Sequence, residues 1–83
     1  MSDLIKRSFS LAGHRTSVAL EAPFWDVLLT TAQSRGIGLS GLVAAVDAER
    51  DGTTALASAL RVRALREALR RPWPSAESSV NLT

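Results

Sequence analysis

The sequence predicts a small, mainly α-helical domain with one or two short strands at its amino end. Three observations predict this fold class. Apolar and polar side chains alternate over residues 8–20, Pro23 opens a helical spacing of apolar residues, and two more helical segments follow breaks at residues 36–38 and 51–52. Alternation is the period of a strand, and apolar residues three or four apart indicate an amphipathic helix. A chain of 83 residues has room for one such domain, and so small a core is marginal alone, which favours an oligomer.

The alternation falls into two segments of opposite parity. Phe9 and Leu11 share one face before Gly13, and alternation resumes after it with the other parity. A slip of one residue moves every side chain to the opposite face, so we expect a bulge or turn at residues 12–14, where glycine is the natural residue. Whether residues 6–13 form a strand of their own stays open. After the turn the inward set is Thr16, Val18 and Leu20, and the outward set is Arg15, Ser17 and Ala19.

Two helices are predicted next. Pro23 suits a first helical position because the N–H that it lacks would be unpaired there. Gly36 is expected to end this helix as a left-handed cap, and the next helix begins at residues 38–40. The apolar face of the first includes Phe24, Trp25, Leu28 and Ala32, and the buried stripe of the second is Leu39, Leu42, Val43 and Val46.

A third helix follows the turn at residues 51–52, with Thr53 or Thr54 as a possible cap. Proline at positions 72 and 74 stops it. The predicted domain therefore spans residues 6–71, between a flexible terminus (1–5) and a polar, disordered tail (72–83). Its buried stripe is expected at Leu56, Ala59, Val62, Leu65 and Leu69, with Arg61, Arg63, Arg66 and Arg70 largely off that stripe.

The net charge is only +2, but the basic residues cluster. Lys6, Arg7 and Arg15 lie near the amino end, and five arginines lie within residues 61–71. Two basic clusters are typical of a protein that binds a polyanion. A solvated helix face explains the second cluster equally well.

Composition excludes several classes of function. The chain has no cysteine and one histidine, His14, so it has no disulfide or cysteine-ligated zinc site, and no metal is expected. No stretch approaches the roughly 18 apolar residues of a membrane span, and no signal peptide is apparent, so we expect a soluble, cytoplasmic protein without membrane contact. Little concave surface is available for a substrate. We therefore expect no catalytic residues, no cofactor and no enzymatic activity.

Gly36, Gly38 and Gly41 form a GxGxxG spacing. A dinucleotide site needs a strand before this motif and an acidic residue about 20 positions later, whereas here a helix precedes it and position 61 is arginine. Small residues at the start of a helix still let a phosphate approach free backbone N–H groups. The motif therefore favours a phosphate contact over a cofactor.

The residue pattern resembles a small bacterial branch of the ribbon-helix-helix superfamily of DNA-binding proteins, over about residues 6–69. The segments that carry the resemblance are Lys6-Arg7-Ser8, Gly13-His14-Arg15-Thr16-Ser17-Val18-Ala19-Leu20-Glu21, Phe24-Trp25, Arg35-Gly36 and Ser58-Ala59-Leu60-Arg61-Val62. The resemblance implies a homodimer in which one strand of each subunit pairs antiparallel, and this intersubunit ribbon enters the DNA major groove. The third helix is then an addition at the carboxyl end.

This resemblance implies a set of site residues. Arg15, Ser17 and Ala19 would contact bases: arginine can grip guanine, serine can bond several bases, and alanine can touch a thymine methyl. Contacts to phosphate are expected from Lys6, Arg7, His14, Gly38, Leu39 and Ser40. The dimer core is expected at Thr16, Val18, Leu20, Phe24, Trp25, Leu28, Leu39, Val43 and Val46.

Two functions from different classes remain open. One is a sequence-specific DNA-binding transcriptional regulator, a repressor associated with the nucleoid, which Arg15 and Ser17 with the paired basic clusters favour. The other is a dimeric protein-interaction module, or an antitoxin-like protein, with weak or non-specific DNA binding and a protein partner on the third helix or tail. Ala19 and the modest net charge favour the second.

Overall fold

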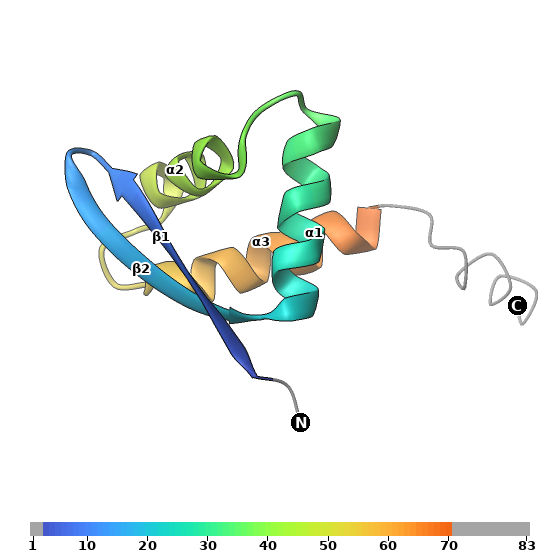
Figure 1. Cartoon of the computed structure of the whole chain (residues 1–83), viewed down its shortest axis with the longest axis horizontal. Helices are drawn as coiled ribbons and strands as arrows, with labels where there is room; N and C mark the ends of the chain where they lie inside the picture. Colours follow the sequence, from blue (N-terminus) through green and yellow to red (C-terminus); the bar gives the residue numbers. More distant parts are fainter. Residues whose placement is uncertain (1–2, 71–83) are drawn as a thin grey trace, which may run out of the picture.

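The computed structural model describes residues 3–70, which form a β-hairpin followed by three helices (Figure 1). The elements are β1 (Leu4–Leu11), β2 (His14–Glu21), α1 (Ala22–Ser34), α2 (Leu39–Glu49) and α3 (Leu56–Arg70). This order confirms the predicted fold class, including the additional carboxyl-terminal helix. β1 begins within the segment expected to be a flexible terminus, and the predicted tail, residues 72–83, lies outside the described residues.

The two strands pair antiparallel across a two-residue turn, Ala12–Gly13. Leu11 faces His14 at the turn, and the pairing continues to Leu4 and Glu21. The φ angles of Ala12 (51°) and Gly13 (82°) are both positive, as the favoured two-residue hairpin turn requires. The change of parity predicted at Gly13 is therefore this turn, and residues 4–11 are a strand of their own. The strand expected to pair with a second subunit, β2, has one edge paired with β1 of the same chain.

Gly36 forms the predicted left-handed cap after helix α1, whose last residue is Ser34. The N–H of Ile37 donates to the carbonyl of Ala32 (3.0 Å) and the N–H of Gly36 to that of Gln33 (3.1 Å). Gly36 has a φ of +69°, so these bonds form the glycine-dependent motif that commonly closes a helix. The cap turns the chain from α1 toward α2 (Figure 1).

We expect Gly36→Ala to lower the free energy of unfolding by about 1 kcal/mol, because a β-carbon is unfavourable at this positive φ. Gly52→Ala is the matched control, since Gly52 lacks a left-handed φ and has no atom within 4 Å of an added β-carbon; its expected change is below about 0.5 kcal/mol. Chemical denaturation measures both variants. Equal losses would contradict the assignment of Gly36 as the strained position.

One hydrophobic core joins the hairpin to the helices. Trp25 of α1 is 1% exposed, its ring centroid is 5.9 Å from that of Phe9, and its indole N–H donates to the carbonyl of Ile5 at 2.8 Å. These contacts fasten α1 to the inner face of β1. The buried core consists of Phe9, Leu11, Val18, Leu20, Trp25, Leu28, Ala32, Leu42, Val43, Val46, Leu56, Leu60 and Ala64.

The buried face of α3 differs from the prediction. The predicted stripe was wrong at three positions, because Val62, Leu65 and Leu69 are 47%, 56% and 75% exposed. The buried residues are Leu56, Leu60, Ala64 and Glu67. Residues four apart lie on one helix face, and this second apolar stripe is the one that packs into the core.

The start of α3 also differs from expectation. Ala55, and neither threonine, precedes the helix, and its carbonyl accepts the N–H of Ala59 (3.0 Å). The hydroxyls of Thr53 and Thr54 donate instead to Oδ1 of Asp51, at 2.6 and 3.1 Å. The threonines therefore organise the turn before α3 and do not cap the helix.

Candidate nucleic-acid interface

The hairpin presents one polar side away from the core, here called the outward face. It comprises Lys6, Ser8 and Ser10 of β1 and Arg15, Ser17 and Ala19 of β2. The register places these residues opposite one another as the pairs Lys6–Ala19, Ser8–Ser17 and Ser10–Arg15. Phe9, Leu11, Val18 and Leu20, which alternate with them, are buried in the core. The anchored inner side thus fixes the orientation of the outward face.

Positive charge on the outward face is not neutralised by any acid within residues 3–70. Lys6 and Arg15 are exposed, and neither forms an ion pair within residues 3–70. Glu21 ends the same strand, but its carboxylate accepts a hydrogen bond from Arg61 at 3.1 Å. A hydrogen bond from its own backbone N–H to the carboxylate, together with the hydrogen bond from Arg61, holds the pKa of Glu21 below its usual range. The face therefore offers two cations around small side chains.

The structure brings together all three residues predicted to contact bases. Arg15, Ser17 and Ala19 lie in one row on β2, and Lys6, predicted as a phosphate contact, joins them from β1. Ser8 and Ser10 complete the face, and Ser8 Oγ lies 3.0 Å from Ser17 Oγ. These two serines were missing from the predicted site. The signal that could have found them is the two-residue turn at Gly13, which sets the register between the strands.

Arg7 and His14 lie apart from this face. Arg7 lies on the inner side of β1. Its guanidinium carbon is 5.5 Å from the centroid of the Trp25 ring, which is a cation–π contact. His14 is exposed at the turn, opposite Leu11. Of the three amino-terminal cations, Lys6 and Arg15 thus share the outward face and Arg7 does not.

The start of α2 provides free backbone donors. Gly38 precedes the helix without a side-chain cap, and its carbonyl accepts the N–H of Leu42 at 3.2 Å. The first N–H groups of a helix have no partner within it, and its dipole attracts anions there. Leu39 and Ser40 carry the first two of these groups. Figure 1 shows this end of α2 directed toward α1 and the opposite end toward the hairpin turn.

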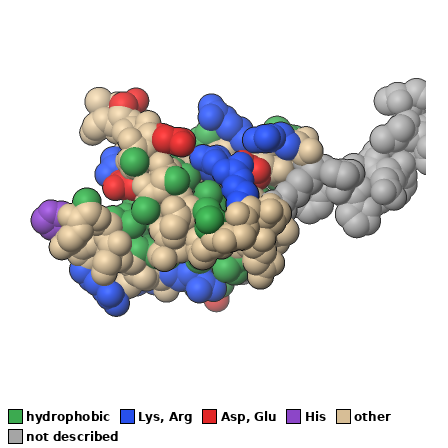
Figure 2. Space-filling view, turned by 90° about the horizontal axis from the view of Figure 1, so that it is seen from above, with side chains coloured by type: hydrophobic (Ala, Val, Ile, Leu, Met, Phe, Trp, Pro, Cys, Tyr) green, Lys and Arg blue, Asp and Glu red, His purple; other side chains and the backbone are tan. Residues whose placement is uncertain are grey.

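The arginines near α3 are largely neutralised by acids. Glu67, 6% exposed, accepts contacts from Arg35 (2.9 Å), Arg63 (3.1 Å) and Arg70 (3.6 Å). Burial by itself would raise the pKa of Glu67, but the hydrogen bond from Arg63 and the charges of Arg35 and Arg70 outweigh it and hold that pKa below its usual value. Figure 2 shows Asp and Glu among the Lys and Arg side chains on one side of the molecule, and along the opposite edge mainly Lys and Arg side chains with an acid beside them. Charge near α3 therefore mainly stabilises the fold.

The expected dimer-core residues fall into two groups. Three of them, Thr16, Phe24 and Leu39, are half-buried and keep surface for a second subunit. The others are buried within the single chain: Val18, Leu20, Trp25, Leu28, Val43 and Val46. The role of these residues at a subunit interface stays a prediction.

No helix within residues 3–70 is long and apolar enough to cross a membrane. The same residues contain no group of three His, Asp or Glu side chains arranged to hold a metal ion.

Comparison with protein-family models gives a match. Residues 4–68 match the model of a family described as ribbon-helix-helix domain. This span includes both strands, α1, α2 and most of α3. Neither the curated proteins nor the solved structures contain a match.

Proposed function

The chain belongs to the ribbon-helix-helix domain family, and from this premise we propose that it is a sequence-specific DNA-binding regulator of transcription that acts as a homodimeric repressor. Members of the family are generally DNA-binding transcription regulators or antitoxins, and their domains are dimeric. A repressor of this kind works in the cytoplasm at the nucleoid and requires no enzymatic step.

The outward face is the observation that carries the proposal. A two-stranded ribbon fits the major groove, which is about 12 Å wide. The hydroxyls of Ser8, Ser10 and Ser17 can donate to or accept from base edges, and Arg15 can bind O6 and N7 of guanine together. Ala19 can contact a thymine methyl. A face of short side chains lets the backbone of the ribbon come close to the bases.

A dimer places the two strands of each subunit in different roles. Because one edge of β2 is paired with β1, antiparallel pairing with a second subunit uses the other edge of β2. Strands lie about 4.8 Å apart, so the two central β2 strands fit within the groove and the outer β1 strands lie near its walls. Arg15, Ser17 and Ala19 then face bases, while Lys6 faces phosphate.

Further phosphate contacts come from outside this face. The N–H groups at Gly38, Leu39 and Ser40 are suited to a phosphate because they begin a helix. His14 is exposed at the hairpin turn, and Arg7 is exposed although it contacts Trp25. These residues bind the backbone in any sequence and so set affinity and salt dependence.

Selection from a randomised duplex pool at two salt concentrations, followed by sequencing of the retained DNA, tests the proposal. The wild-type protein should retain a two-fold symmetric site. Arg15→Ala should cost about 1–3 kcal/mol and relax base preference at one position of each half-site. Lys6→Ala should instead weaken binding to all sequences alike and reduce the salt slope by about one for each phosphate that is no longer neutralised.

Arg66→Ala is the matched control, since Arg66 is also exposed and without an ion pair within residues 3–70 but lies on α3. It should leave the selected sequence unchanged. Unaltered affinity and preference in both Arg15→Ala and Lys6→Ala would refute the outward face as the DNA-binding surface.

A second candidate function is an antitoxin-like or other protein-interaction module. The exposed apolar side chains of Val62, Leu65 and Leu69 on α3 favour it, because apolar patches on a small protein commonly mark an interface. Ala19 favours it too, since alanine discriminates bases poorly. Weak, steeply salt-dependent binding without a consensus in the same selection would support this function over the first.

A further inference from the structure

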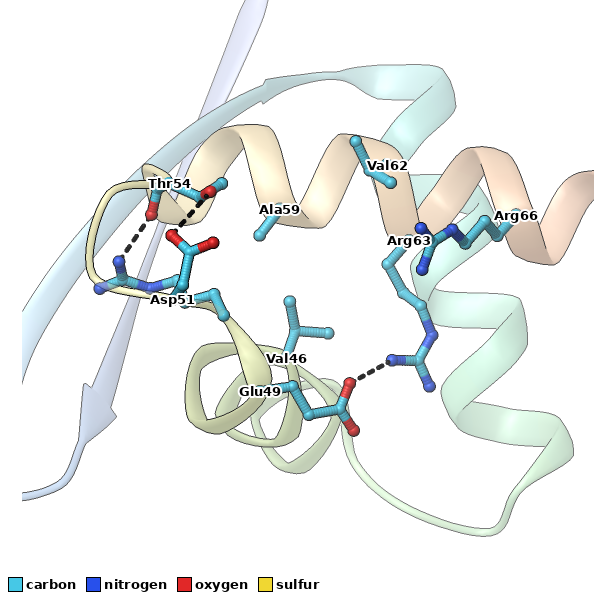
Figure 3. Close-up of a pocket in the computed structure, with 9 residues that line it drawn as sticks. Val46, Glu49, Asp51, Thr54, Ala59, Val62, Arg63 and Arg66 are labelled. Atoms are coloured by element: carbon cyan, nitrogen blue, oxygen red, sulfur yellow. Dashed lines mark hydrogen bonds and ion pairs between the residues drawn. The ribbon is translucent and has the colours of Figure 1, made fainter.

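A pocket of about 330 Å³ lies between the end of α2 and α3 (Figure 3). Its volume is within the range of small-molecule sites. The apolar side chains of Val46 and Ala59 lie in its middle, Val62 lies nearer the arginines, and Arg63 and Arg66 lie together toward one end. The pocket therefore has apolar side chains between two charged ends, and its α3 end carries two arginines.

The charged side chains that line the pocket differ in the hydrogen bonds and ion pairs that they form. Asp51 accepts hydrogen bonds from Thr53 and Thr54, and Arg50 donates to Asp47 (2.8 Å) and to the carbonyl of Thr54 (2.7 Å). These interactions occupy the charges at the loop end of the pocket.

At the other end, Arg63 contacts Glu67 at 3.1 Å and Glu49 at 3.4 Å. Glu49 is exposed, and its carboxylate forms the longer of these contacts, which Figure 3 marks by a dashed line. Arg66 has no ion pair among the described residues. Of the three arginines in the lining, Arg50 pairs with Asp47 and Arg63 with Glu67 and Glu49, so Arg66 is the cation that is unpaired among the described residues.

We propose that this pocket binds a small organic anion with an apolar body, its carboxylate at Arg66 and Arg63 and its apolar part against Val46, Ala59 and Val62. A guanidinium matches a carboxylate in shape and binds it with charge-assisted hydrogen bonds. The carbonyl end of α2 carries partial negative charge, so the carboxylate is held at the α3 side. This site is separate from the outward face of the hairpin and does not depend on DNA binding.

Titration with octanoate, followed by amide chemical shifts in NMR spectra, tests the proposal without DNA. Saturable shifts should concentrate at Val46, Ala59 and Val62. Octanamide, which has the same chain but no charge, should bind at least about tenfold more weakly, as loss of a charge-assisted hydrogen bond implies.

Two substitutions should change octanoate binding in opposite directions. Arg66→Gln should weaken it about tenfold, which corresponds to about 1.4 kcal/mol. Glu49→Gln should strengthen it, because it removes the carboxylate that competes for Arg63. Arg70→Gln is the control on the same helix and outside the pocket, and it should leave affinity unchanged.

Three results would each overturn the proposal. They are the absence of saturable shifts with octanoate, equal affinity for octanoate and octanamide, and an Arg66→Gln variant that binds like the wild type. None of them bears on the outward face, because DNA binding is measured separately.

Discussion

Replacement of Trp25 by alanine is expected to lower the free energy of unfolding by about 3–5 kcal/mol, a large part of the 5–15 kcal/mol typical of a domain. The indole is almost completely buried and contacts Phe9, and it donates a hydrogen bond to Ile5. Alanine would leave a cavity and would also remove the indole N–H donor. Urea denaturation followed by far-UV circular dichroism measures the loss.

Trp25→Phe separates the two parts of this effect. Phenylalanine keeps an aromatic ring near Phe9 but lacks the N–H that donates to Ile5 at 2.8 Å, so we expect a loss of about 1–2 kcal/mol. If the alanine variant lost no more than the phenylalanine variant, the packing of Trp25 would not be what fastens the hairpin to α1.

Trp25 also connects stability to the proposed function. It holds the inner side of β1, and the outward face of Lys6, Ser8 and Ser10 is the opposite side of the same strand. A ribbon that enters a groove must present its side chains in a fixed orientation. Loosening β1 should therefore weaken DNA binding even though Trp25 itself would touch no DNA.

The outward face could be predicted in part because alternation assigns side chains to faces. It put Arg15, Ser17 and Ala19 on one side of a strand, and the structure has the same arrangement. Alternation does not identify the neighbouring strand, since any partner satisfies the same pattern. Ser8 and Ser10 were therefore not recognised as part of the site, although Phe9 and Leu11, which alternate with them, were correctly predicted to share the other face.

Helical periodicity was ambiguous for α3 because this helix has two apolar stripes. Leu56, Leu60 and Ala64 are spaced as well for burial as Val62, Leu65 and Leu69, and only packing against the rest of the chain decides between them. The arginine clusters show the same limit. Their positions are visible in the sequence, but the convergence of Arg35 and Arg63 on Glu67 depends on contacts between α3 and the end of α1.

Charge reversal at this convergence, Glu67→Lys, should destabilise the protein by about 3–5 kcal/mol, as expected when a buried ion pair is broken. It would place a fourth, nearly buried cation beside Arg35, Arg63 and Arg70, whose guanidinium groups now contact the carboxylate. Arg50→Glu is a milder reversal for comparison, because Arg50 pairs with Asp47 in an exposed contact and surface pairs are worth at most about 1 kcal/mol. Losses of equal size would show that Glu67 does not organise the arginines.

The contribution of Glu67 should also depend on pH in one direction. Its pKa in the folded protein lies below the usual 4.5, because contacts with Arg63, Arg35 and Arg70 exceed the effect of burial. A lowered pKa means that the ionised form stabilises the fold, so this stabilisation is complete above pH 4.5 and disappears as the pH falls through the folded-state pKa. Glu67→Gln resembles the protonated residue. It should therefore be less stable than the wild type at neutral pH, and the difference should close in acid; a difference that stays constant with pH would mean that the side chain acts through its shape and not its charge.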